Sequence, residues 1–169
     1  MSINIKQFLF IFFILIFTSQ AQTEEVKKMG THKDWETYII KSNSGKVCFA
    51  QSKPVLQAPK TNDREARLFI TFRPNENIKN EISITAGYNF NKQNTITAAS
   101  GKYKYKFDIA QEKFAWMADS KQEKKMINTM KKGSRIMVKG YNSKGSQTTD
   151  HYSLLGFTKA YNATKANCS

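Results

Sequence analysis

Residues 148–168 read TTDHYSLLGFTKAYNATKANC, and this stretch decides how the rest of the chain folds. Its first part combines β-branched and aromatic side chains with polar ones, which is typical of a strand. Gly156 interrupts this pattern and predicts a turn. After the glycine, core-facing side chains recur at helical spacing, so a short amphipathic helix is expected to follow and to end at Cys168. The core-facing positions are Phe157, Ala160, Tyr161 and Thr164.

The first residues of the chain have the three parts of a secretory signal peptide. Lys6 supplies a positive charge, and Phe8–Phe17 is an apolar run. Ser19–Ala21 fits the small-x-small pattern of a cleavage site, in which one residue of any type lies between two small ones. A membrane anchor is the alternative, but this run is shorter than the roughly 20 apolar residues that a span needs. We therefore expect residues 1–21 to be a signal peptide and the chain from residue 22 onward to be exported.

The chain has two cysteines, Cys48 and Cys168. A cysteine pair in an exported chain most often forms a disulfide. A reactive thiol or a metal pair would need neighbours that are absent, because there is no CxxC motif and no histidine within a few residues of either cysteine. We therefore predict a structural disulfide that fastens the closing helix to an early strand. In the chain-entropy model, closing a loop on the order of 100 residues stabilises the fold by up to about 4.7 kcal/mol.

The chain is strongly basic, with a formal net charge of +14, and removal of the signal peptide takes away only Lys6. A cationic exported protein is expected to meet anionic surfaces such as phospholipid heads, lipopolysaccharide or acidic glycans. Nucleic acid is the usual partner of such charge, but export disfavours it. General solubility explains the charge as readily as a partner does, so that alternative stays open.

Short alternating runs predict an all-β sandwich in which residues 34–169 form a single domain. Residues 22–33, QTEEVKKMGTHK, are polar and are expected to form a flexible leader. Residues 52–66 contain two prolines without periodicity and are expected to form a long loop, of a kind that is often functional. The expected strands cover residues 35–40, 46–51, 67–73, 81–87, 94–99, 102–109, 112–117, 134–140 and the first part of 148–168.

One further helix is expected inside the chain. Asp119 is a good N-cap residue, and Gln122 occupies the third position of a capping box. Gly133 is placed to end the helix. The apolar stripe between these ends contains Met126, Ile127 and Met130, and it is narrow enough to be core packing against a sheet.

The strand at residues 102–109, KYKYKFDI, carries the most concentrated basic pattern. Lysines interleaved with aromatic rings can mark single-stranded nucleic-acid binding. Here the period of two places Lys102, Lys104 and Lys106 on one face and the rings on the other, which disfavours that use. A half-buried strand with a solvated lysine face explains the pattern. A basic binding face for anionic ligands, made of these three lysines, is the alternative.

Catalytic, cofactor and metal motifs are absent from the sequence. Asp150, His151 and Ser153 suggest a triad, but neighbouring strand residues point to opposite faces and Ser153 lies about 6–7 Å along the strand from His151. No GxSxG motif, phosphate loop or metal-ligand spacing is found. We expect no enzyme activity, no cofactor and no bound metal. An enzyme would instead need a pocket that brings His151 to a carboxylate or hydroxyl from elsewhere in the chain.

Five sequence blocks, in this order, resemble the invasion-associated locus B family of exported proteins of alphaproteobacteria. The blocks are KVCFAQSKP (46–54), FITFRP (69–74), NEISITAGYNF (80–90), MKKGSRIMVKG (130–140) and TTDHYSLLGFTKAYNATKANC (148–168). The resemblance runs from about Asp34 to Cys168, and both cysteines occupy family positions. Residues that match the family framework are Trp35, Arg73, Pro74, Gly87, Tyr88, Gly140, Tyr152, Leu154, Gly156 and Phe157.

The resemblance implies an immunoglobulin-like β-sandwich in the bacterial periplasm, with outer-membrane association and peripheral membrane attachment as further options. It implies neither enzyme activity nor a cofactor, and it links family members to entry into host cells. The leading expectation is therefore a non-enzymatic envelope protein that binds an anionic surface, a glycan or a protein partner. The second reading is a periplasmic accessory module, chaperone-like or inhibitory, that acts on another protein.

Overall fold

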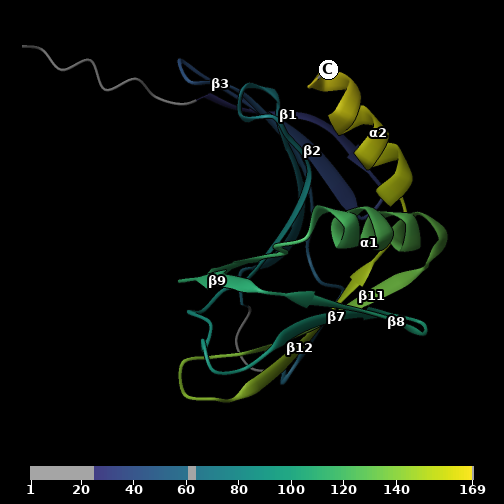
Figure 1. The fold of residues 1–169 in the computed structure, drawn as a ribbon. Helices are drawn as coiled ribbons and strands as arrows, with labels where there is room; N and C mark the ends of the chain where they lie inside the picture. The colour runs from purple at the N-terminus through teal and green to yellow at the C-terminus, as the bar shows by residue number, and fades with distance from the viewer. Residues whose placement is uncertain (1–24, 61–63, 169) are drawn as a thin grey trace, which may run out of the picture.

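The computed structural model describes residues 25–60 and 64–168, which form two antiparallel sheets and two α-helices (Figure 1). The larger sheet holds, in spatial order, β1 (Glu25–His32), β2 (Trp35–Ser42), β3 (Gly45–Ser52), β5 (Ala66–Arg73), β6 (Ile78–Ala86), β10 (Phe114–Trp116) and β9 (Ile109–Gln111). The smaller sheet holds β4 (Leu56–Ala58), β12 (Gln147–Ser153), β11 (Arg135–Tyr141), β7 (Ile96–Ser100) and β8 (Tyr103–Phe107). This sandwich-like arrangement confirms the predicted all-β class.

The two helices cover the inner side of the larger sheet. Helix α2 (Phe157–Asn167) packs on β2 and β3, whereas α1 (Ser120–Lys132) contacts β6, α2 and β8 (Figure 1). A short 3₁₀ helix, Pro74–Glu76, joins β5 to β6. Helix α1 therefore lies where the two sheets and the closing helix meet, and its predicted apolar stripe is buried there.

The period of two along the strands separates a buried face from a half-exposed face. On the inner face of the larger sheet, Leu68, Ile70, Ile82 and Ile84 are buried. On the outer face, aromatic rings contact one another within a strand, between neighbouring strands and across β6, with centroids between 5.1 and 6.3 Å apart. These rings belong to Tyr38, Phe49, Phe69, Phe114 and Trp116. Cross-strand aromatic pairs of this kind stabilise a sheet from its solvent side.

The predicted leader is wrong for residues 25–32, which form strand β1 and pair with β2 along their length. Most side chains of β1 are exposed, including Val26 at 56% and Met29 at 42%. A strand held mainly by backbone pairing at a sheet edge has no apolar face for the sequence to reveal. The predicted signal peptide, residues 1–21, lies outside the described residues.

The predicted loop at residues 52–66 is also partly a strand. Residues Leu56–Ala58 form β4, which pairs with β12 at one edge of the smaller sheet. Three residues are too few to show an alternating pattern in the sequence. The strand is defined by its backbone pairing with β12, which the sequence does not reveal. Residues 61–63 of this segment are outside the described part of the chain.

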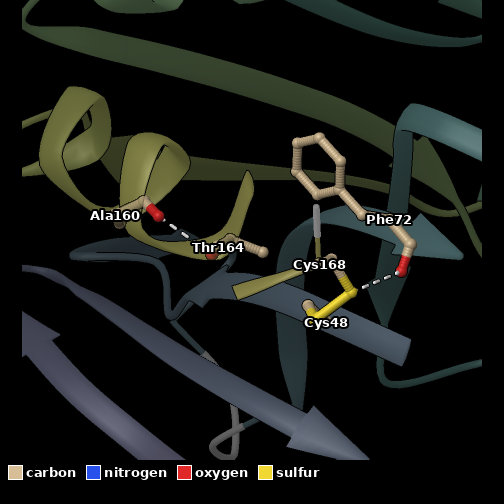
Figure 2. The surroundings of a disulfide bond; sticks show 5 residues. All are labelled: Cys48, Phe72, Ala160, Thr164 and Cys168. Atoms are coloured by element: carbon tan, nitrogen blue, oxygen red, sulfur yellow. Dashed lines mark hydrogen bonds between the residues drawn. A yellow bond between two sulfur atoms is a disulfide. The ribbon is translucent and has the colours of Figure 1, made fainter. Parts of the chain in front are cut away.

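The two cysteines lie at disulfide distance, in agreement with the sequence prediction. Cys48 of β3 and Cys168 at the end of α2 have Cα atoms 5.8 Å apart and are joined through their sulfurs (Figure 2). Both residues are buried, and the sulfur of Cys168 lies 3.6 Å from the carbonyl oxygen of Phe72. Inside α2, the hydroxyl of Thr164 donates to the carbonyl of Ala160 at 2.8 Å (Figure 2). The end of the chain is thereby linked to the centre of the larger sheet.

A close backbone approach fixes the start of α2. Gly156 has φ +91°, and a Cβ atom there would lie 1.8 Å from the carbonyl oxygen of His32. Only glycine fits this position, because both the conformation and the space exclude a side chain. Beside it, the indole nitrogen of Trp35 donates to the carbonyl of Ser153 at 3.0 Å, and its ring packs edge-on against Phe157 at 4.9 Å. The stretch from Ser153 to Phe157 thus packs against the β1–β2 turn.

Candidate functional site

A groove of about 880 Å³ runs between α1 and the edge strand β8. This volume lies within the roughly 300–1,000 Å³ that ligand sites occupy. One wall comes from α1, the other from β8 and the β7–β8 turn, and the segment that joins α1 to β11 closes one end. Its lining residues are Ser100, Gly101, Tyr103, Lys104, Tyr105, Gln122, Lys125, Asn128, Thr129, Lys132, Gly133, Ser134 and Arg135.

The spacing of residues along α1 creates the helical wall. Gln122, Lys125, Asn128, Thr129 and Lys132 recur every three or four residues, so they lie along one side of the helix. The adjacent side carries the buried apolar stripe that holds α1 against the core. The wall is therefore presented by a helix whose position is set by burial.

Tyr105 connects the two walls at the base of the groove. It is buried, and its hydroxyl lies 2.6 Å from the hydroxyl of Thr129 and donates to the carbonyl of Lys125 at 3.3 Å. At the closed end, the hydroxyl of Ser100 donates to the carbonyl of Arg135 at 2.8 Å. These bonds join β7 and β8 to α1 and β11, which fixes the spacing of the walls.

The groove is lined by four cations and by no carboxylate: Lys104, Lys125, Lys132 and Arg135. All four side chains are exposed, and within the described residues none of them forms an ion pair. Basic side chains around a hollow reinforce one another and produce a positive potential that attracts anions. The arrangement is therefore suited to binding a negatively charged ligand.

The three lysines offered as a possible basic face are all exposed, and their surroundings in the structure differ. Lys104 lines the groove. Lys102 lies in the β7–β8 turn, with its ammonium 5.7 Å from the ring centre of Tyr103, and Lys106 pairs with Asp108 at 3.3 Å. The predicted division of β8 into a lysine face and a buried aromatic face holds at Tyr105, which is buried. It does not hold at Tyr103, which is 51% exposed. Only one of the three lysines thus joins the cations of α1 and β11.

A second polar cluster surrounds Asp150 on the opposite edge of the smaller sheet. Its carboxylate accepts two hydrogen bonds from the guanidinium of Arg64, at 2.5 and 3.1 Å, and only 3% of the Asp150 side chain is exposed. Arg64 also donates to the carbonyl of Ala86 and lies 5.7 Å from the ring centre of Tyr88. Burial raises the pKa of Tyr88, whose hydroxyl lies 2.6 Å from that of Thr148. The cluster ties the segment before β5 to β12.

The residues of the suggested triad do not hydrogen-bond to one another in the described chain. Asp150 faces Arg64. Ser153 accepts a bond from the backbone nitrogen of Leu155 at 3.2 Å. His151 is half-buried, and its Nδ1 has no hydrogen-bond partner among the described residues. The period of two places Asp150 on the buried face of β12, and His151 and Ser153 on the opposite, half-buried face.

The described residues contain neither a metal-binding cluster nor a helix that could span a membrane. In residues 25–60 and 64–168, no cluster of three or more His, Cys, Asp or Glu side chains is arranged to hold a metal ion. No helix in the same ranges is both long and apolar enough to cross a membrane.

Sequence reasoning missed most of the groove because its walls are distant in the chain. The lysines of α1 resemble any solvated helix face, and β8 precedes α1 by more than a dozen residues. The one available signal was the spacing of Gln122, Lys125, Asn128 and Lys132 without an acidic residue among them. That spacing defines a basic side of the helix but does not show what lies opposite.

Residues 35–165 match the family model described as Invasion associated locus B (IalB) protein. The match spans most of the chain and includes every strand from β2 to β12. No curated protein and no solved structure matched the chain.

Proposed function

This chain belongs to the invasion-associated locus B family, and on that premise we propose that it is a non-enzymatic exported protein that binds an anionic partner through the groove beside α1. The observation that carries the proposal is the set of four cations around one hollow without a carboxylate. Elsewhere in the described chain, basic side chains such as Lys28, Arg64 and Arg73 have carboxylate partners. Cations that the fold leaves without partners are available to a ligand.

The proposed setting is the periplasm, with association at the outer membrane. The sequence pattern at residues 1–21 supports export, and envelope surfaces supply anionic groups such as lipid phosphates and acidic chains. A contribution to entry into host cells is part of the proposal because of the family description. The absence of enzyme activity is supported by the separate partners of Asp150 and Ser153.

A second candidate function is an accessory module that acts on another periplasmic protein. The observation in its favour is that β1 and β8 are edge strands, and β1 exposes Val26 and Met29. Edge strands are ready to pair with another chain unless something covers them. This candidate predicts binding that depends on backbone pairing and apolar contact, and therefore little on salt.

The test compares two variants of equal net charge. The groove variant carries Gln at the four cationic positions, and the matched control carries Gln at four exposed lysines that do not line the groove. The control positions are Lys27, Lys41, Lys79 and Lys144. Each oxidised protein, from residue 22 onward, is titrated with vesicles of anionic phospholipid and with polyglutamate, at low and at physiological ionic strength.

The proposal expects the groove variant to bind at least one of these probes roughly tenfold more weakly than the control, at both ionic strengths, because the four cations act together at one place. Salt should weaken the wild-type protein without abolishing the difference. Equal loss in both variants would overturn the proposal, since the charge would then be a general surface property. Binding that neither variant weakens would favour the accessory-module reading.

A further inference from the structure

Strand β8 has one free edge, and the cationic groove lies beside that strand. It pairs with β7 over five residues and is the last strand of the smaller sheet, so no other described strand pairs with its outer edge. In an antiparallel edge strand, every second residue directs its N–H and C=O groups away from the sheet. Apart from the sheet ladder, no backbone–backbone hydrogen bond involves residues 103–107 in the described chain. These groups are available to an incoming strand.

Resting on the proposed function, we propose that the groove takes an extended, acidic peptide segment of another protein, which adds to β8 as a further strand of the smaller sheet. Recognition of this type uses main-chain hydrogen bonds for affinity and pockets for alternate side chains for specificity. Here the hydrogen bonds come from the free edge of β8, and α1 supplies the second wall.

The lengths of the two walls agree with such a ligand. Strand β8 has five residues and spans about 17 Å at roughly 3.4 Å per residue. Helix α1 has 13 residues and spans about 20 Å at 1.5 Å per residue. Figure 1 shows α1 alongside the β7–β8 hairpin. A segment of five to seven extended residues would contact both walls along its length.

Charge defines the side chains of the ligand. In an added strand, successive side chains point to opposite faces of the sheet. One set would face α1, where Lys125 and Lys132 lie together with the amides of Gln122 and Asn128. Because no carboxylate lines the groove, acidic residues at every second position of the segment would be matched with cations and with amide donors.

The other sheet edges fit this ligand less well. Strands β4 and β9 have three residues each, too few for a comparable ladder. Strand β1 is longer, but Lys28 is already paired with Glu36, and the hollow beside β1 includes Glu25. The combination of a free edge, an opposing helix and unpaired cations therefore singles out β8.

The experiment uses a seven-residue peptide with glutamate at every second position and valine or threonine between, titrated into the oxidised protein from residue 22 onward by fluorescence anisotropy. Two further peptides have the same sequence but carry methyl groups on the backbone nitrogens of every second residue. One is methylated at the odd-numbered positions (the first phase) and the other at the even-numbered positions (the second phase). Methylation removes main-chain donors and leaves the charge unchanged. A fourth peptide replaces every glutamate with glutamine. Amide hydrogen exchange of residues 103–107 is followed with and without the first peptide.

The inference expects the first peptide to bind and to slow exchange in β8. At least one methylated phase, and also the glutamine peptide, should bind roughly tenfold more weakly, because each loses several of the contacts that β-addition requires. Protein with Gln at the four groove cations should lose binding, whereas the matched control variant should retain it.

The contrary outcomes separate this inference from the proposed function. If both methylated peptides bind as well as the parent while the groove variant loses binding, β-addition is overturned and the anion-binding groove stands. The same conclusion follows if anionic vesicles bind through the groove and the peptide does not. If the groove variant binds the peptide and the vesicles as well as wild-type protein does, both proposals fall.

Discussion

Two sets of basic side chains in this molecule are used in opposite ways. In the first set, Arg64, Arg73 and Lys28 each face a carboxylate, in Asp150, Glu81 and Glu36 respectively. In the second set, the four cations of the groove line one hollow without any carboxylate. The first set joins one strand or segment to another, whereas the second has no ion-pair partner in the described chain. The basic residues behind the high net charge therefore include both cations that pair within the fold and cations that the groove leaves unpaired.

Burial explains the sharpest contrast, which is between the Arg64–Asp150 pair and the groove cations. Only 14% of the Arg64 side chain and 3% of that of Asp150 are exposed, and a charge removed from water must be paired and hydrogen-bonded to persist. The groove cations are exposed, so water and salt satisfy them in the absence of a ligand. The comparison therefore predicts a large effect on stability for the buried Arg64–Asp150 pair, a smaller one for the partly exposed Lys28–Glu36 pair, and effects on binding but not on stability for the groove cations.

The largest expected effect is at Asp150. Replacing it with Asn would leave the guanidinium of Arg64 largely buried without a counter-charge, and the loss of one partner of such a pair costs about 3–5 kcal/mol. Urea unfolding at neutral pH measures this loss. Asp108→Asn is the matched control, because it breaks an exposed pair with Lys106 and should cost less than about 1 kcal/mol. Similar losses in the two variants would break the comparison.

A smaller effect, with a defined dependence on pH, is expected at Glu36. Hydrogen bonds from Lys28, and then from Tyr38 and Gln51, lower the pKa of Glu36 from 4.5 to about 2 against the effect of its burial. A carboxyl group with a lowered folded-state pKa adds stability above its unfolded-state pKa, and this contribution disappears as the pH falls from about 4.5 to about 2. Because the pair is partly exposed, the contribution is about 1 kcal/mol.

The measurement is urea unfolding of wild-type protein and Glu36→Gln at pH 7 and near pH 2. The two proteins should differ at neutral pH and converge in acid. A constant difference across this range would show that Glu36 acts through packing and not through charge.

Glu123 tests the same linkage with the opposite sign. It is a buried residue of α1 that accepts a hydrogen bond from the backbone nitrogen of Ile82 at 2.9 Å, and burial raises its pKa. A raised carboxyl pKa means that the folded state holds its proton more tightly, so stability falls as the pH rises through the titration of this group. Glu123→Gln should remove this decrease because glutamine does not titrate, and its amide oxygen can still accept the bond from Ile82. Urea unfolding of both proteins over a range of pH measures the effect. If the variant shows the same pH dependence as wild-type protein, the expectation is contradicted.

The smallest expected effect on stability is in the groove. Lys104→Gln combined with Lys125→Gln should change the free energy of unfolding by no more than about 0.5 kcal/mol, because both side chains are exposed and have no ion-pair partner in the described chain. The same variant should bind polyglutamate more weakly than wild-type protein. A loss of stability comparable with that of Asp150→Asn would mean that these lysines support the fold, and the comparison would fail.

Much of the fold was readable from local patterns. The β-branched and aromatic content around Tyr152 predicted β12, and the helical spacing from Phe157 to Thr164 identified the residues that α2 buries. Asp119 caps α1 as expected, accepting a bond from the backbone nitrogen of Lys121. These predictions hold because each rests on a period or a cap within a few neighbouring residues. Strand β1 was missed because it is held by pairing with β2 and shows no local pattern. The burial of Glu123 was missed because its hydrogen-bond donor, the backbone nitrogen of Ile82, is distant in the chain.

The sequence by itself determined the all-β class, the two helices and the residues that the closing helix buries, together with the excess of basic residues and the pattern for export. The tertiary structure alone decided which cations are paired and which line the groove. Arg64 meets Asp150 across 86 positions of the chain, and Lys104 shares a hollow with Lys125 only because α1 packs against β8. Periodicity reports which side of an element is buried, but the partner across a gap depends on how whole elements pack.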